Sequence, residues 1–170
     1  GTAVGTTAGV LIGKKMDKAK AEAAAIANAQ VESVTDANGL QAVKVTFDSG
    51  ILFATNKAEL NSSAKASLKE FADVLKNYTD ADVAIVGHTD NTGSDAINNP
   101  LSLKRAQSVE SYLKSCGVTA DQITSVDGKG SKEPVADNGT AAGRTQNRRV
   151  EVFMYASQEM IDAANAGTLK

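Results

Sequence analysis

The chain of 170 residues has few of the residue types that carry redox, metal or base-stacking chemistry. Its single cysteine, Cys116, excludes an intramolecular disulfide and any CxxC metal or redox motif. Tryptophan is absent, tyrosine and phenylalanine together number seven, and the net charge is −2. A nucleic-acid-binding surface is therefore not expected, because such surfaces are basic and often rich in aromatic residues.

Long apolar runs are also absent. The sequence contains no run of about 18 apolar residues, the length needed to span a bilayer, and no recognisable signal peptide. The apolar start nevertheless places Gly5, Gly9 and Gly13 four residues apart. This spacing lines one helix face and is typical of small-xxx-small packing in membranes. We interpret residues 1–13 as the end of a truncated glycine-zipper segment. With no large side chains on the glycine face, the segment is expected to add nothing to the stability of the domain.

What the chain does contain suits one compact domain, since 42% of its residues are hydrophobic. The Ala-rich residues 14–30 predict a helix whose small residues pack on a partner or form a stalk. Two alternating β-prone runs flank Asn38-Gly39, which predicts a hairpin. Residues 31–156 are expected to form the main domain, and residues 157–170 a C-terminal helix and tail.

Helical and strand patterns alternate through the main domain. Residues 61–78 and 102–116 have helical spacing, with Ser102 as the N-cap of the second helix and Gly117 as its stop. Strands are expected at residues 82–89, 123–130 and 148–156, and a loop at 131–143. The order predicts an α/β (α+β) sandwich, in which helices pack on a mixed sheet with a βαβαβ-β core plus an N-terminal helix and a hairpin strand.

Enzymatic interpretations find little support. His88 and Asp90 could belong to a hydrolase site, but a single histidine without a second ligand cluster disfavours zinc. His88 is more simply a histidine bonded into the loop that follows it. "NTGS" has Asn91 where an aspartic protease needs its acid, and "DNTGSD" lacks the glycine and glutamate of a calcium loop. We expect no catalytic residues, no metal and no cofactor, and hence a protein that is not an enzyme.

Two opposite charges remain to be explained. Asp90 follows a buried strand, where α/β sheets commonly present ligand sites. With Ser102 as N-cap, Arg105 would lie in the first helical turn, where free N–H groups and the helix dipole attract a carboxylate. An acid beside an arginine suits a zwitterionic ligand such as an amino-acid end. A simple Asp90–Arg105 salt bridge explains the pair equally well, and the residues alone leave both interpretations open.

Three motifs, "GHTD" from Gly87, "LSLKRA" from Leu101 and "NRRV" from Asn147, resemble the OmpA/MotB/Pal-type peptidoglycan-binding domain, over about residues 43–155. The resemblance implies non-covalent binding of the peptidoglycan peptide stem through diaminopimelate. It assigns the ligand-binding acid and arginine to Asp90 and Arg105. It further implies contributions from Thr55, Asn56, Asn91 and Thr92, and from Arg148 as a ligand residue or a structural one.

The family resemblance also implies a setting. It suggests an outer-membrane lipoprotein at the periplasmic side of a Gram-negative envelope, tethered through an N-terminal part beyond this sequence, with oligomers possible. The alternative is a stator- or scaffold-type assembly protein built on the same domain. Ala54, Ile97 and Pro100 depart from the pattern of many relatives, which bears on the shape of the pocket rather than on the charge pair.

Overall fold

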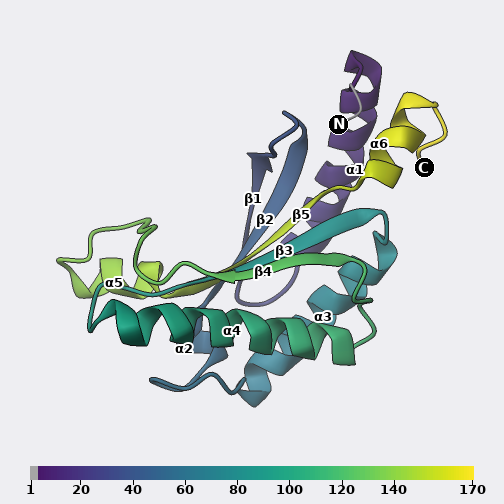
Figure 1. Cartoon of the computed structure of the whole chain (residues 1–170). Helices are drawn as coiled ribbons and strands as arrows, with labels where there is room; N and C mark the ends of the chain where they lie inside the picture. Colours follow the sequence, from purple (N-terminus) through teal and green to yellow (C-terminus); the bar gives the residue numbers. More distant parts are fainter. Residues whose placement is uncertain (1–3) are drawn as a thin grey trace.

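The computed structural model describes residues 4–170 and has the mixed α/β architecture that the sequence predicts (Figure 1). In chain order the elements are α1 (Thr6–Ala24), β1 (Ala29–Thr35), β2 (Gln41–Asp48), α2 (Ser49–Leu52), α3 (Ser62–Asn77), β3 (Ala81–His88), α4 (Asp95–Ser115), β4 (Ile123–Gly128), α5 (Ala141–Asn147), β5 (Arg149–Ala156) and α6 (Gln158–Asn165). The short helices α2 and α5 were not predicted. None of the helices in this described part is long and apolar enough to cross a membrane.

The five strands form one sheet in the order β1-β2-β5-β3-β4, in which only β3 and β4 are parallel. Alternate residues of β2 are buried from Val43 onward, as expected for a strand with one face on a core, whereas the first four residues of β5 are buried on both faces. That core joins the sheet to α1, α3, α4 and α6. The ring centroids of Phe47 on β2 and Phe71 on α3, for example, lie 5.8 Å apart.

The N-terminal segment packs on the fold, which corrects two expectations. Helix α1 runs from Thr6 to Ala24, so the boundary expected between residues 13 and 14 lies inside a single helix. Its first turns bury Ala8 and Ile12 in the common core, which argues against the expectation that residues 1–13 add nothing to the stability of the domain. Helix α1 as a whole packs within this chain, on β1, β2 and α6, and its Ala-rich part buries Met16, Ala19 and Ala23. Residues 1–3, part of the expected zipper segment, lie outside the described residues.

The helix that carries Arg105 begins earlier than predicted. Helix α4 starts at Asp95 with Ser94 as N-cap and continues through Pro100, so Ser102 is not its N-cap. The buried Asn98 fixes this first turn, since its side-chain amide donates to the Thr92 carbonyl oxygen at 3.0 Å. The helix ends as expected before Gly117, whose φ of +106° suits glycine. Arg105 consequently lies near the middle of α4, away from the free N–H groups of the helix start.

The two ends of the molecule differ. At one end, α1 and α6 pack together beside the first residues of β3, where the Lys15 ammonium bonds Asp80 at 2.7 Å. Helix α6 begins after Ser157 as predicted, with the Ser157 hydroxyl accepting from the Met160 N–H. At the opposite end of the β3–β5 ladder lie the last residues of β3 and the segment that contains α5 (Figure 1).

Candidate functional site

Strand register brings two distant motifs together at this second end of the sheet. Strands β3 and β5 are antiparallel, and their last pair is His88 with Arg149. The residues just beyond this pair, Asp90 after β3 and Arg148 before β5, therefore meet. The same Arg149 pairs with Asp48 at the end of β2, and the Ser49 N–H donates to the Arg148 carbonyl oxygen at 3.0 Å. The candidate site is thus built where three strands end or begin.

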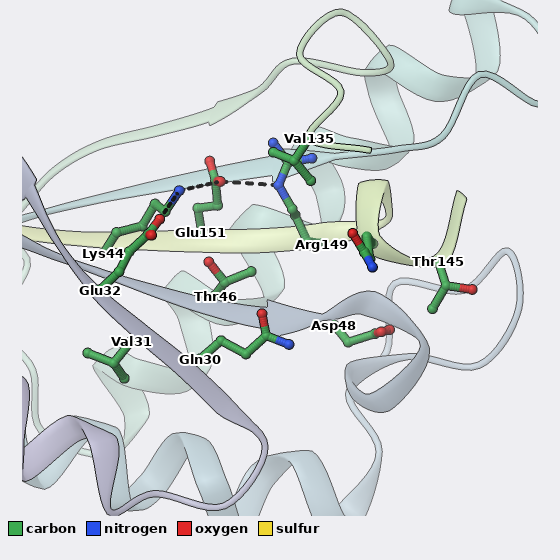
Figure 2. Close-up of a pocket in the computed structure, with 11 residues that line it drawn as sticks. Gln30, Val31, Glu32, Lys44, Thr46, Asp48, Val135, Thr145, Arg149 and Glu151 are labelled. Carbon is green, nitrogen blue, oxygen red and sulfur yellow. Dashed lines mark hydrogen bonds and ion pairs between the residues drawn. The ribbon is translucent and has the colours of Figure 1, made fainter. Parts of the chain in front are cut away.

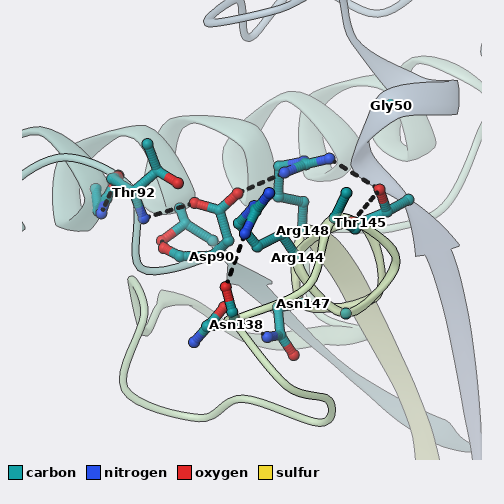
Figure 3. Close-up of polar contacts among 12 residues, drawn as sticks. Gly50, Asp90, Thr92, Asn138, Arg144, Thr145, Asn147 and Arg148 are labelled. Atoms are coloured by element: carbon teal, nitrogen blue, oxygen red, sulfur yellow. Dashed lines mark hydrogen bonds and ion pairs between the residues drawn. The ribbon is translucent and has the colours of Figure 1, made fainter.

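Asp90 is buried and bonded on both carboxylate oxygens. Its Oδ1 accepts from the Thr92 N–H at 2.8 Å, and its Oδ2 is paired with Nη1 of Arg148 (Figure 3). Burial alone would raise the pKa of Asp90, but the Thr92 N–H and the Arg148 guanidinium outweigh it, and the pKa lies below its usual value. Asp90 is therefore ionised at neutral pH, and its position is fixed by these two bonds.

Two glycines let α4 approach the sheet closely enough to place Arg105. A Cβ on Gly87 would lie 2.1 Å from the carbonyl oxygen of Ser102, and one on Gly128 would lie 2.4 Å from the Leu103 nitrogen. Any larger residue would push the helix away from β3 and β4. Arg105, at the next turn of α4, then reaches over the segment that leads from α2 to α3.

Arg105 is buried with only 6% of its surface exposed, yet it has no carboxylate partner. Its Nε donates to the Lys57 carbonyl oxygen at 2.9 Å, and its guanidinium lies 5.1 Å from the ring centroid of Phe53. Within residues 4–170, no carboxylate oxygen approaches it to within ion-pair distance. Burial, together with the charge of Arg148, lowers the pKa of Arg105, although an arginine stays protonated. The interpretation of Asp90 and Arg105 as a salt bridge is therefore wrong, because Asp90 pairs with Arg148 instead.

Asp90 and Arg105 line one cavity of about 730 Å³ between α2, α4 and α5. Of the other residues that the family resemblance selects, Thr55, Asn56, Thr92 and Arg148 also line it. Asn91 is exposed and is not among the lining residues. Among the residues that depart from the family pattern, Ala54 lines the cavity, whereas Ile97 and Pro100 are exposed and do not.

Sequence reasoning missed Arg144 and Phe53, which also line this cavity. The Arg144 Nη1 donates to the Asn138 carbonyl oxygen at 3.0 Å, within the segment drawn in Figure 3. The segment around Arg144 was predicted to be a loop up to residue 143, which hid the helix α5. The spacing of four between Arg144 and Arg148 was the available signal, because residues four apart lie on one face of a helix, and Arg148 is the C-cap of α5.

A second charged region lies on the other face of the sheet, across β1, β2 and β5 (Figure 2). Glu151 accepts from Nε of Arg149 at 3.1 Å and lies 2.8 Å from Nε2 of His88. The sequence suggested that His88 bonds into the loop that follows it. Its ring instead bonds to Glu151 on the neighbouring strand β5. Burial opposes ionisation of Glu151, but the His88 bond and the Arg149 charge hold its pKa at about 2. Lys44 forms ion pairs with both Glu32 and Glu151. The charges of this cluster are therefore matched among the described residues.

Comparison with known proteins agrees with the motifs. The model of the OmpA family matches residues 52–148. The peptidoglycan-binding protein ArfA of Mycobacterium tuberculosis is 47% identical over 104 residues, which cover 61% of this chain and 32% of ArfA. The outer membrane porin F of Pseudomonas aeruginosa is 40% identical over 124 residues, 71% of this chain and 35% of the porin. The match to these relatives thus spans about a third of their length.

Solved structures share the fold. The cell wall anchor of the T6SS from Pseudomonas aeruginosa superimposes with a TM-score of 0.69 at 29% identity, covering 84% of this chain and 97% of that one. The periplasmic domain of Helicobacter pylori MotB gives a TM-score of 0.68 at 19% identity, over 85% and 90% of the two chains, which is a likeness of fold alone. Because the family model covers more than half of the sequence, the chain belongs to the OmpA family.

Proposed function

We propose that this protein binds the peptide stem of peptidoglycan non-covalently, through the free amino-acid end of diaminopimelate. One observation carries the proposal: Arg105 is a buried guanidinium with no carboxylate partner among residues 4–170, in the same cavity as the buried anion Asp90. Buried charges in proteins are normally matched, so an unmatched one points to a ligand that supplies the counter-charge. The family membership and the name of the relative ArfA support peptidoglycan as the source of that ligand.

The charges in the cavity match a zwitterion. The ammonium group of the ligand would bond Asp90, whose two oxygens offer further lone pairs beside those that Thr92 and Arg148 use. The carboxylate would bond the planar fork of Arg105, with Arg144 and Arg148 adding positive potential. Lysine in place of diaminopimelate would keep the ammonium but leave Arg105 unmatched.

The position of the site supports a tethering role. The cavity lies at one end of the β3–β5 ladder, and α1, through which an N-terminal anchor would continue, lies at the other (Figure 1). We infer that the domain joins the outer membrane to the cell wall from the periplasmic side. The outer-membrane relatives support this localisation, and the MotB-like fold also accommodates the scaffold alternative.

We further infer that binding involves no bond cleavage, because the charged groups that line the cavity, Asp90, Arg105, Arg144 and Arg148, suit the recognition of a charged ligand. Release of muropeptide fragments from purified sacculi would contradict this inference. The direct test of the proposed function is calorimetric titration with a diaminopimelate-containing stem peptide and with its lysine equivalent. Loss of one partner of a desolvated charge pair costs roughly 2–5 kcal/mol, so the lysine peptide should bind at least about 30-fold more weakly. Equal affinities would overturn the proposal.

A further inference from the structure

A second hollow continues from the candidate site along α4. It has a volume of about 960 Å³ and lies between α4 and the segment that leads into α3. Asn56 and Leu101 line both this hollow, here called the α4 groove, and the cavity that holds Asp90 and Arg105. A ligand that fills the first cavity can therefore extend into the α4 groove.

The wall of the α4 groove is attached to the candidate site. Arg105, which lines the first cavity, holds the groove wall through its bond to the Lys57 carbonyl oxygen. One turn further along α4, the Ser108 hydroxyl donates to the Ala58 carbonyl oxygen at 2.5 Å. The groove is therefore shaped by bonds between two segments and is not a chance gap between mobile side chains.

The α4 groove carries unmatched positive charge. Lys57, Lys65 and Lys104 line it, and none of the three forms an ion pair with a described residue, while Glu59 is its only lining carboxylate. By contrast, Lys69 on α3 and Lys114 on α4 are each paired with a carboxylate four residues away. Tyr112 also lines the groove, with the Lys65 ammonium 6.0 Å from its ring centroid. Hydroxyl and amide groups from Gln107, Ser108 and Ser111 complete the lining.

We propose that the α4 groove binds the carboxylates that flank diaminopimelate in the same stem peptide, above all the free α-carboxylate of the neighbouring glutamate. This glutamate is linked to diaminopimelate through its side chain, so its α-carboxylate stays available for a lysine. The inference rests on the proposed function, because the diaminopimelate end must occupy the first cavity for the rest of the peptide to reach the groove. It adds a preference: the protein distinguishes stems that keep this carboxylate from stems in which it is amidated.

The expected effect is moderate and sensitive to salt. The three lysines are exposed, and exposed ion pairs contribute little each and are screened at high ionic strength. We expect a preference of about 3- to 10-fold for the carboxylate stem over its α-amide, which decreases as salt is added.

The test compares four ligands on three proteins by calorimetry. The ligands are the stem peptide with the free α-carboxylate, its α-amide, its lysine equivalent and a peptide-free glycan fragment. The proteins are the wild type, the groove variant Lys57→Gln/Lys104→Gln and the control Lys18→Gln/Lys132→Gln. The control removes two exposed lysines that line neither the groove nor the first cavity, and so changes the net charge equally.

The groove variant should lose the preference for the carboxylate stem and bind the α-amide as the wild type does, and the control should keep the preference. Equal wild-type affinities for the two stems, or a groove variant that keeps the preference, would overturn the inference. Glycan binding that only the groove variant loses would assign the groove to sugar and overturn it too. These outcomes leave the proposed function intact, because that function is tested separately by comparing the diaminopimelate and lysine stems.

Discussion

Two adjacent arginines of the NRRV motif serve opposite faces of the sheet. Arg149 reaches the face shown in Figure 2, where Glu151 accepts from its Nε and the Asn147 and Glu133 carbonyl oxygens accept from its Nη groups. Arg148 reaches the candidate site, where it pairs with Asp90 (Figure 3). Arg105, which has no carboxylate partner among residues 4–170, lines the same cavity. Both regions bury charge, but only in the first is every buried arginine paired with a carboxylate of the described chain. The comparison separates an arrangement that stabilises the fold from one that is completed by a ligand.

The largest expected effect is on the matched region. Arg149→Leu removes the bond to Glu151 and both carbonyl contacts of the guanidinium, and leaves a buried carboxylate with less compensation. Breaking a buried pair by removing one partner costs about 3–5 kcal/mol. Urea denaturation should report a loss of stability of this order. A variant within about 1 kcal/mol of the wild type would show that the Glu151 region does not stabilise the fold.

The second largest expected effect is a loss of stability at acid pH, caused by protonation of Glu151 in the matched region. The pKa of Glu151 is about 2 in the folded protein, below the ordinary value of 4.5. A carboxyl with a lowered folded pKa stabilises the fold above its unfolded pKa and loses this contribution as pH falls through the folded one. Stability on the order of 2–3 kcal/mol should therefore be lost between about pH 4.5 and pH 2.

The control for this acid effect is Glu151→Gln, which cannot titrate. Thermal unfolding measured across the same pH range should show a shallower slope for the variant than for the wild type. Parallel slopes would mean that other carboxyls account for the acid sensitivity.

A substitution that displaces α4 should lower both stability and ligand affinity, with a smaller loss of stability than Arg149→Leu. Gly128→Ala places a Cβ against the Leu103 backbone, and overpacking of this kind typically costs about 1–3 kcal/mol. Because α4 carries Arg105, the variant should also bind the stem peptide more weakly. The matched control is Gly9→Ala in α1, where the added Cβ meets nothing closer than 4.0 Å. Wild-type stability and affinity in Gly128→Ala would contradict the role given to the close approach.

The smallest expected effect on stability is at Arg105. Arg105→Met removes an unmatched buried charge and keeps most of the side-chain volume, which offsets the lost bond to the Lys57 carbonyl oxygen. We expect a change within about 1 kcal/mol by urea denaturation, in contrast to Arg149→Leu. A large loss would make Arg105 a structural residue, as in the first region.

Much of the fold follows from local patterns. The hairpin around Asn38-Gly39, a helix within residues 61–78 and the start of α6 after Ser157 were all predicted, because turn and capping residues and helical spacing act over a few positions. The start of α4 was not predicted, since Pro100 is a local signal against a helix. The buried Asn98 and the packing of α4 on Gly87 and Gly128 override it.

The same distinction applies to the candidate site. Motifs identified Asp90, Arg105 and Arg148, and the structure brings all three to one cavity. Which arginine pairs with Asp90 depends on the register of β3 against β5, which residues far apart in sequence determine together. The sequence therefore left the salt bridge open, and the structure assigned it to Arg148. The burial of Arg105 without a carboxylate partner among the described residues also depends on tertiary packing and could not be predicted.

The central claim, that the carboxylate partner of Arg105 is supplied by the ligand, is tested most directly by calorimetric titration of wild type and Arg105→Met with the diaminopimelate stem and its lysine equivalent. The account predicts that the wild type prefers the diaminopimelate stem by at least about 30-fold and that the variant binds both peptides weakly and equally. A variant that folds normally and keeps the wild-type preference would contradict the claim, because Arg105 would then not be the group that recognises the carboxylate.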